Sequence, residues 1–516
     1  MCTEGDVAVR RYNYGVGGRA MKFGLAAGLA FILASSTAMA AEGVSTDPII
    51  PDDVKKVDHT NDAFGDDPTY EDKPYSPEAQ YEIYGAKQDA PTPRPALELG
   101  RPIYTDGPFQ EGIDVIGGKN LLFPGLSIFG DWQTAVEYND NGADERGHIA
   151  TTLNLNVNLQ LTGTERIFMF VRPLEKDGQV TRYEFFGDDE DGSDENLNGN
   201  IDALFFEGDV GSIMTGLTDE EQHYDLPIAF GFVPLLFQNG IWVDETVIGG
   251  AAGIIAQNDP GLGISNMDLT FFYAGDNVEN PNIVDQLGVR EEHNLNVFGM
   301  AGFVEANEGY WEFGYGALRG ENGNEDEDFD SLTVAFSKRY GGWLSNSVRG
   351  IWSYGQDRVG NAAQTVDGFA LLVENSLITH LPSTLVPYGN FFIGFDKPAP
   401  LIDQTGLLKN TGITFDSDGL QGFPKLDDSA NDTFGGAIGV QYLFNLDQQI
   451  VVEAATNQAI GGLDANRNAI NDQYAVGFRY QLPISTTWIM RADGIYGWLR
   501  DADDIRGARL EFRKKF

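Results

Sequence analysis

Charged residues of both signs share one face of the last three segments of the chain. In residues 473–481, 488–498 and 507–516, apolar side chains alternate with polar ones, which is the period-two pattern of an extended strand. Charges of both signs on a rigid wall create a transverse electric field across a water-filled lumen. Alternatively, they pair with one another and only keep the wall hydrated. The candidate pore-lining residues, one of them from an earlier segment, are Arg349, Arg479, Arg491, Asp493, Arg509, Glu511 and Arg513.

A second candidate for chemistry is the acidic loop of residues 194–202. Its sequence matches the first nine positions of an EF-hand-type calcium loop, D-x-N-x-N-G-x-I-D. Position twelve is Phe205 instead of a bidentate glutamate, so calcium would bind weakly. The alternative is a solvated acidic loop without an ion. The residues of the candidate metal site are Asp194, Asn196, Asn198, Asn200 (through its carbonyl) and Asp202.

The chain offers no catalytic motif. Its five histidines fall outside any H-E-x-x-H pattern, and it contains neither a G-x-S-x-G elbow nor a P-loop. The only cysteine is Cys2, so no disulfide or thiolate metal site is expected. The net charge of −44 disfavours nucleic acid and favours divalent cations. We therefore expect no enzymatic activity, no nucleic-acid partner and no cofactor apart from calcium in the acidic loop.

The N-terminal residues have the features of an export signal. Residues 21–40 combine a basic start, an apolar run too short to span a bilayer and an Ala-x-Ala cleavage site before Ala41. Residues 1–20 are interpreted as a misassigned upstream start. Residues 41–120 are acidic and carry several prolines, so we expect an extended or disordered periplasmic segment.

Long alternating segments fill the remainder of the chain, residues 121–516. The segment 149–161 is over a dozen residues long, whereas strands of soluble sheets average ~5–6 residues and transmembrane strands need ~9–11. Short turns alternate with longer acidic loops, which favours an all-β fold, a transmembrane antiparallel up-and-down β-barrel of roughly 16–18 strands. The other predicted strands lie at 126–138, 295–305, 310–319, 332–340, 346–354, 369–374, 386–395, 434–444, 450–455, 474–481 and 488–498.

The chain ends in an aromatic residue on the apolar face of its last strand. Ala508, Leu510, Phe512 and Phe516 share that face, and Lys514 interrupts it. A terminal aromatic of this kind marks the strand that seals an outer-membrane barrel and acts as its assembly signal. With the export signal and the alternating segments, it resembles the porin-type outer-membrane β-barrels of Gram-negative bacteria. The stretch 230–242 is weakly similar to large export barrels of the alginate type.

This resemblance implies a location in the outer membrane and a water-filled channel for passive diffusion of small hydrophilic solutes or ions. Acidic loops at the mouth outnumber the arginines of the wall, so we expect a modest cation preference. The alternative is a structural or adhesive barrel whose acidic loops bind cations. The implied partners are outer-membrane lipid, lipopolysaccharide and the barrel-assembly machinery, and the barrel could form a homo-oligomer.

Overall fold

The computed structural model describes residues 94–101, 112–176, 178–187, 192–283, 293–358, 363–382, 384–416, 420, 422–444, 448–461 and 467–516. The predicted upstream start at 1–20 and the signal peptide at 21–40 lie outside these residues, as does most of the segment 41–120.

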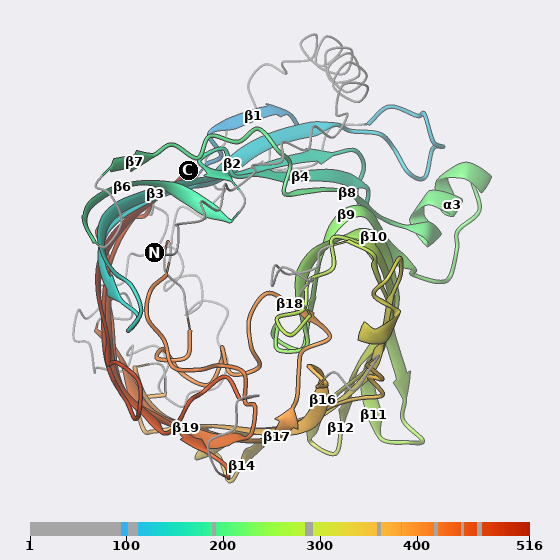
Figure 1. The fold of residues 1–516 in the computed structure, drawn as a ribbon. Coiled ribbons are helices and arrows are strands. Elements are labelled where there is room, and N and C mark those ends of the chain that lie inside the picture. Colours follow the sequence, from blue (N-terminus) through green and yellow to red (C-terminus); the bar gives the residue numbers. More distant parts are fainter. Residues whose placement is uncertain are drawn as a thin grey trace.

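The described strands form a closed antiparallel ring, seen along its axis in Figure 1. Of the 23 described strands, β1, β5, β7 and β18 do not form positions of the ring, and β4 and β6 share one position beside β3, which leaves 18 positions. The ring strands are β2 (Gly125–Asp140), β3 (Glu145–Gln160), β4 (Arg166–Val171), β6 (Gln179–Gly187), β8 (Ala203–Asp209), β9 (Pro227–Phe237), β10 (Val243–Asp259), β11 (Ile264–Asp276), β12 (Leu295–Ala306), β13 (Gly309–Gly320), β14 (Phe329–Tyr340), β15 (Leu344–Tyr354), β16 (Asp367–Leu377), β17 (Leu385–Lys397), β19 (Thr433–Phe444), β20 (Gln448–Ala459), β21 (Gln473–Pro483), β22 (Trp488–Leu499) and β23 (Ile505–Lys515).

Because neighbouring strands run in opposite directions, their connections fall alternately at two ends of the barrel. The turn end carries short connections such as 307–308 and 341–343. It also carries the nine-residue helix α3 (Val210–Thr218) between β8 and β9. The loop end carries the longer connections. One is 172–202, which contains β5 (Glu175–Lys176), β7 (Gly192–Asp194) and the strand β6 that returns to pair with β3. Another is 398–432, with β18 (Ile402–Asp403). No helix among the described residues is long and apolar enough to cross a membrane.

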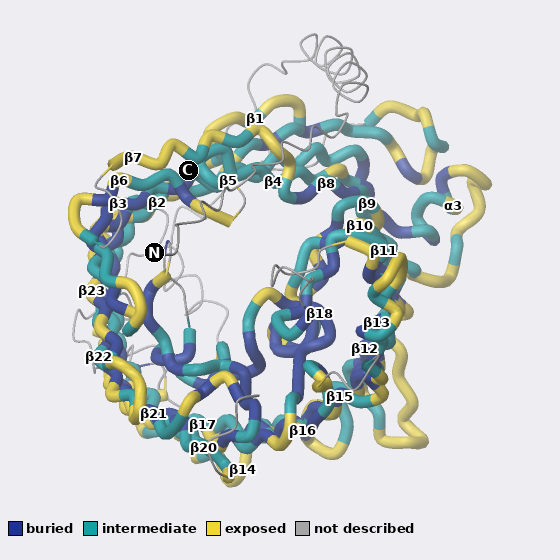
Figure 2. Tube along the Cα trace, in the orientation of Figure 1, coloured by how far each residue is buried: buried dark blue, intermediate teal, exposed yellow. Residues whose placement is uncertain are grey.

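Side chains alternate between the outside and the inside of the ring, as the sequence predicts. In β23, Leu510 and Phe512 are exposed on the outside, whereas Arg509 and Glu511 are buried inside. The same pattern recurs around the ring, and the exposed residues in Figure 2 therefore lie largely on its outer surface. An outer surface of large apolar side chains suits contact with lipid.

The inside of the ring is partly filled. Beside β8–β14 the inner faces are apolar, and they pack against Trp242, Leu401 and Ile402, which enter from loop-end connections. Figure 1 shows the connection 398–432 running inside the ring, away from the rim from which it starts.

Two parts of the fold differ from the sequence-based expectations. Leu97–Gly100 forms strand β1, which pairs with Gly125–Ile128 of β2, although it belongs to the segment 41–120 that we expected to be extended or disordered and separate from the barrel. The pairing gives β1 backbone hydrogen-bond partners that the composition alone does not reveal. The strands β4, β6, β8, β9, β10 and β11 were not among the predicted segments. The stretch 230–242 forms most of β9 and the tight turn into β10.

The ring closes where β23 pairs with β2, and its last hydrogen-bonded pair joins Phe516 to Gly130. The amide of Phe516 donates to the Gly130 carbonyl at 3.0 Å, and the amide of Gly130 donates back at 2.9 Å. We predict that deletion of Phe516 reduces the fraction of chains that run as compact, heat-modifiable barrels on unboiled gels. Phe516→Ala keeps both backbone hydrogen bonds, so it separates the role of the phenyl side chain from that of the strand pairing. Normal assembly of the deletion variant would contradict this prediction.

Candidate pore constriction

Residues 398–432, called the inner loop below, connect β17 to β19 and fold back into the barrel (Figure 1). The backbone of Ala399 exchanges two hydrogen bonds with the hydroxyl of Ser353 on β15, at 2.9 and 3.2 Å. The amide of Leu401 then donates to the carbonyl of Trp242 at 2.9 Å. Strand β18 follows, and it pairs in parallel with Val243–Asp244 of β10. The first part of the inner loop thus crosses from β15 to β10 inside the ring.

A lysine holds this first part at its crossing point. The ammonium of Lys409 lies 2.6 Å from a carboxylate oxygen of Asp403 and 2.8 Å from one of Asp244 on β10. Burial raises the pKa of Asp403, and the ammonium of Lys409 opposes that rise. The ion pair therefore compensates part of the cost of placing a carboxylate inside the barrel.

Glu453 of β20 anchors the middle of the inner loop. Its buried carboxylate accepts hydrogen bonds from the amides of Ile413 and Thr414, both at 3.0 Å, and from the Thr414 hydroxyl at 2.7 Å. The hydroxyl of Tyr388 on β17 donates to the same carboxylate at 2.5 Å. Backbone amides that are buried away from water need hydrogen-bond acceptors, and the carboxylate of Glu453 is the acceptor for two of them.

Apolar packing holds the inner loop against the wall. The buried side chains of the inner loop are leucines and phenylalanines. On β19–β21 they face alanines, which leave room for them, and on β22 and β23 they face isoleucines. The loop side chains are Leu407, Leu408, Phe415, Phe423 and Leu426, and the wall side chains of β19–β23 in the same cluster are Ala437, Ala455, Ala475, Ile495 and Ile505.

The tip of the inner loop reaches the first strands of the ring. Leu420 packs with Ala135 of β2 and Ala150 of β3, and its amide donates to the carboxylate of Glu137 at 3.3 Å. Glu137 lies opposite His148 in the β2–β3 pairing, and the two side chains are 3.6 Å apart. The inner loop therefore contacts widely separated parts of the ring and narrows the lumen between them.

Three of the predicted pore-lining arginines gather on one aspartate. Asp493 of β22 accepts from Arg479 of β21 at 2.7 Å, from Arg491 at 3.0 Å and from Arg509 of β23 at 2.6 Å. The guanidinium of Arg509 also lies 5.2 Å from the ring centre of Phe423 in the inner loop. We call these four residues the Asp493 cluster. Arg479 also lies 3.8 Å from the carboxylate of Asp416 in the inner loop, so three cations face two anions here and a net positive charge remains.

The Asp493 cluster borders a polar cavity of about 340 Å³ beneath the inner loop. Arg479 and Arg491 line it from the wall, and Lys409 and Asp416 line it from the inner loop. Arg509 is buried behind them, as is Glu511, which lies 3.3 Å from Arg513. The structure thus brings six of the predicted residues together on β21–β23, and it places two of them at the cavity.

Arg349 lies elsewhere. It is on β15, only 1% exposed, and it donates to Gln238 in the β9–β10 turn and to Glu312 of β13 at 2.5 Å. It holds that turn inside the ring together with Thr333, whose hydroxyl donates to Gln238 at 2.8 Å. The period-two pattern placed Arg349 on the inner face correctly. It gave no sign that a turn distant in sequence covers the side chain.

The residues of the predicted calcium loop have other partners. The carboxylate of Asp194 lies 3.0 Å from Arg182, and that of Asp202 accepts the backbone amide of Arg172 at 2.8 Å. The side-chain amide of Asn196 donates to the carbonyl of Val180 at 2.9 Å. Within the described ranges, no three acidic or histidine side chains are grouped to hold a metal ion. Calcium binding at this loop stays a prediction.

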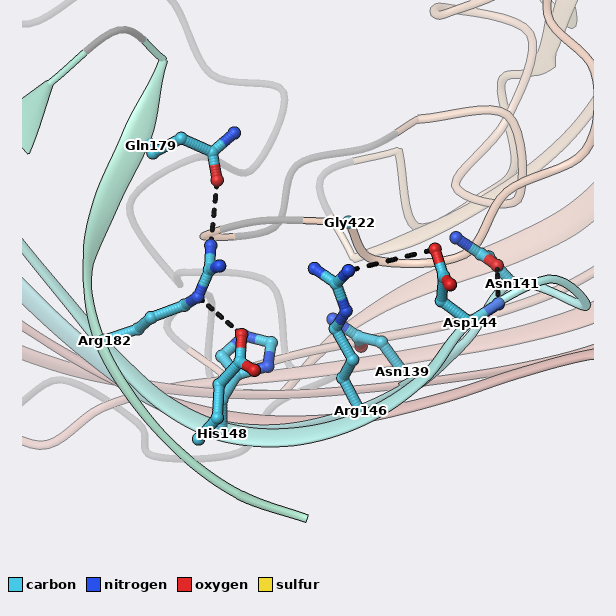
Figure 3. A pocket seen from close by; sticks show the side chains of 9 residues that line it. Asn139, Asn141, Asp144, Arg146, His148, Gln179, Arg182 and Gly422 are labelled. Carbon is cyan, nitrogen blue, oxygen red and sulfur yellow. Dashed lines mark hydrogen bonds and ion pairs between the residues drawn. The ribbon is translucent and has the colours of Figure 1, made fainter. Parts of the chain in front are cut away.

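A second polar cavity, of about 160 Å³, lies at the loop end between β2, β3, β6 and Gly422 of the inner loop (Figure 3). Arg146 extends into it between Arg182 on one side and Asp144 on the other. Arg182 is held by Gln179, at 2.8 Å, and by Glu184, at 2.6 Å. Charges of both signs therefore line the lumen at the loop end as well as beneath the inner loop.

Sequence reasoning missed Lys409, Glu453, Gln238 and Glu312. A partial signal was available, because the inner loop carries more leucines and phenylalanines than a solvated loop needs. The partners of those residues could not be inferred, since they lie on strands far away in the sequence.

No protein-family model matches this chain, and no curated protein matches its sequence. Solved structures with a similar course of the chain include three from Pseudomonas aeruginosa. OccK2 (OpdF) has a TM-score of 0.49 at 10% identity, over 76% of this chain and 97% of that chain. OpdQ has a TM-score of 0.48 at 10% identity, and OccK5 (OpdH) has 0.47 at 11%, each over 76% of this chain and 98% of that chain. With identity this low, the function has to be argued from the lumen of this chain itself.

We predict that Glu453→Gln loosens the inner loop. The amides of Ile413 and Thr414 donate to different oxygens of the Glu453 carboxylate. A glutamine keeps only one of these oxygens and places an NH2 group at the other, so one buried donor loses its partner, at a cost of about 1–3 kcal/mol. The single-channel conductance in planar bilayers should become larger and less steady than that of the wild type. Glu308→Gln is the matched control, because Glu308 lies in an exposed turn and pairs only with Lys338 among the described residues. A correctly assembled Glu453→Gln barrel with unchanged conductance would refute the anchoring role.

Proposed function

We propose that this protein is an outer-membrane channel for passive diffusion of small hydrophilic solutes or ions. The observation that carries the proposal is the inner loop, which narrows a closed barrel and leaves a polar cavity beside the Asp493 cluster. A barrel of 18 positions is too wide for its own side chains to fill, so its interior holds water or inserted chain. The apolar outer surface and the terminal Phe516 support the location in the outer membrane.

The charges of the lumen support a field across the pathway. Glu312 of β13 and Glu374 of β16 lie on the inner face of one part of the wall, where their two negative charges exceed the single positive charge of Arg349. The Asp493 cluster, with its excess of arginines, lies on another part of the wall. A solute with separated charges would turn in such a field as it passes. Because acidic residues dominate the chain and its loops, we propose a modest cation preference at low ionic strength.

A structural or adhesive barrel is the second candidate. The observation in its favour is the apolar filling beside β8–β14, where Trp242, Leu401 and Ile402 are fully buried and leave no room for water. Steady conductance of the purified protein supports the channel, and a pure barrel that conducts no ions supports the structural candidate. Planar-bilayer recording therefore decides between the two.

Selectivity gives a sharper prediction. Replacing both Arg479 and Arg491 by alanine removes two cations from the cavity, so the reversal potential in a salt gradient should shift toward stronger cation preference. Asp493→Asn removes the anion between them, and it should shift the reversal potential in the opposite direction. The shift should be largest at low salt, because the Debye length falls from about 30 Å at 0.01 M to about 10 Å at 0.1 M.

Arg500→Ala is the control for this experiment, because Arg500 is an exposed loop-end residue that pairs with Asp472. It should change the reversal potential little. Equal effects of Arg500→Ala and the double variant would show that the Asp493 cluster does not set the selectivity.

A further inference from the structure

Helix α3 leaves part of its apolar face exposed, at Met214 and Leu217, whereas Val210 and Ile213 of the same face are half-buried. At about 100° per residue, Val210, Ile213, Met214 and Leu217 fall on one face of the helix, with the i, i+3, i+4, i+7 spacing of an amphipathic helix. On a water-soluble protein this face would pack against the core. Here Leu217 is 63% exposed and Met214 is 36% exposed.

The opposite face of α3, with its small residues, packs against the protein. Gly211 and Gly216 are buried, and a Cβ atom added at Gly211 would lie 2.1 Å from the carbonyl oxygen of Tyr224. The side-chain amide of Asn120, from the segment 112–122, donates to the carbonyl of Ser212 at 3.3 Å. Asp209 caps the helix by accepting the Ser212 amide at 2.7 Å, which fixes its orientation. The packing of the small-residue face and the cap at Asp209 therefore fix the direction in which the apolar face of α3 points.

The position of α3 indicates what covers this face. The helix lies outside the ring of strands, beside β8 and β9, at the turn end (Figures 1 and 2). The adjoining strands carry an aromatic pair, Phe206 and Phe230, with ring centres 5.2 Å apart and Phe230 exposed on the outer surface. The outer apolar surface of the barrel thus continues from the strands toward the helix.

The composition of α3 suits a lipid environment. Residues 210–218 include no ionisable side chain, so entering the interface desolvates no charge. The acidic residues Asp219 and Glu220 follow the helix and are exposed, so they would remain in water. An uncharged apolar face offers a protein partner no charge complementarity, whereas a bilayer surface requires none.

We propose that α3 is an interfacial helix, whose face of Val210, Ile213, Met214 and Leu217 lies in the lipid leaflet that borders the turn end of the barrel. The inference rests on the proposed membrane location, and it adds a lipid contact outside the strands. A helix in this position fixes how deep the turn end sits in the leaflet.

The test uses bimane labels on single cysteines. Cys2 is the only cysteine of the sequence, so Cys2→Ser gives a background without cysteine. Leu217→Cys reports on the helix face, and Ile438→Cys reports on the outer wall, where Ile438 is 64% exposed in the middle of β19. Glu220→Cys is the matched control, three residues beyond Leu217 and exposed. Each labelled barrel is inserted into phosphatidylcholine vesicles with or without bromine on the upper part of the acyl chain.

Bromine quenches only labels that contact the acyl chains. We expect the labels at Leu217 and Ile438 to lose about half of their fluorescence and the label at Glu220 to lose little, because only apolar faces enter the acyl region. Met214→Cys should repeat the Leu217 result from the same face. Quenching at Ile438 without quenching at Leu217 or Met214 would overturn the interfacial helix alone, and it would indicate water or a protein on that face. No quenching at Ile438 would overturn the membrane location, and the inference with it.

Discussion

A backbone amide or carbonyl that faces lipid has no water to bond, so a sheet inside a bilayer can have no free edge. In this chain the two edges that would remain, β2 and β23, pair from Asp140–Arg506 to Asp131–Lys515, and the pair of Gly130 and Phe516 completes the seam. The sheet closes with 18 strand positions, and this number determines the width of the ring. Every other feature of the interior is a response to that width.

The interior responds in two ways. Beside β8–β14 it is filled by apolar side chains and by short inserted pieces of chain around Trp242 and Leu401. Beside β20–β23 the inner loop packs on alanine and isoleucine side chains near the loop end. The charged groups of the Asp493 cluster lie farther along the same strands. Chain that enters a barrel brings its own backbone donors and acceptors, and these need partners. Ser353 and Glu453 are such partners, which explains why a carboxylate is buried at the site of Glu453.

The repeating part of this structure could be predicted from the sequence. Alternation identified most strands from β12 onward, the inner face of Arg479, Arg491 and Asp493, and the barrel itself, because a period of two follows from the local geometry of a strand. Strands β8 to β11 were not predicted, because glycines and apolar residues occupy both faces there and the alternation of polar and apolar residues is lost, as in Gly249–Gly253. The inner loop could not be predicted, since its contacts join distant residues. Leu420 meets Glu137 across 283 positions of sequence.

The placement of Arg349 shows why facing inward is not the same as facing the pore. Its guanidinium is covered by the β9–β10 turn and neutralised by Glu312, so it supplies little field to the lumen. Arg479 and Arg491 have the same orientation on their strands, but they border an open cavity and share Asp493 with Arg509. The electric field inside the ring therefore depends on which part of the wall the inserted chain leaves uncovered, and the Asp493 cluster borders a cavity at such a part.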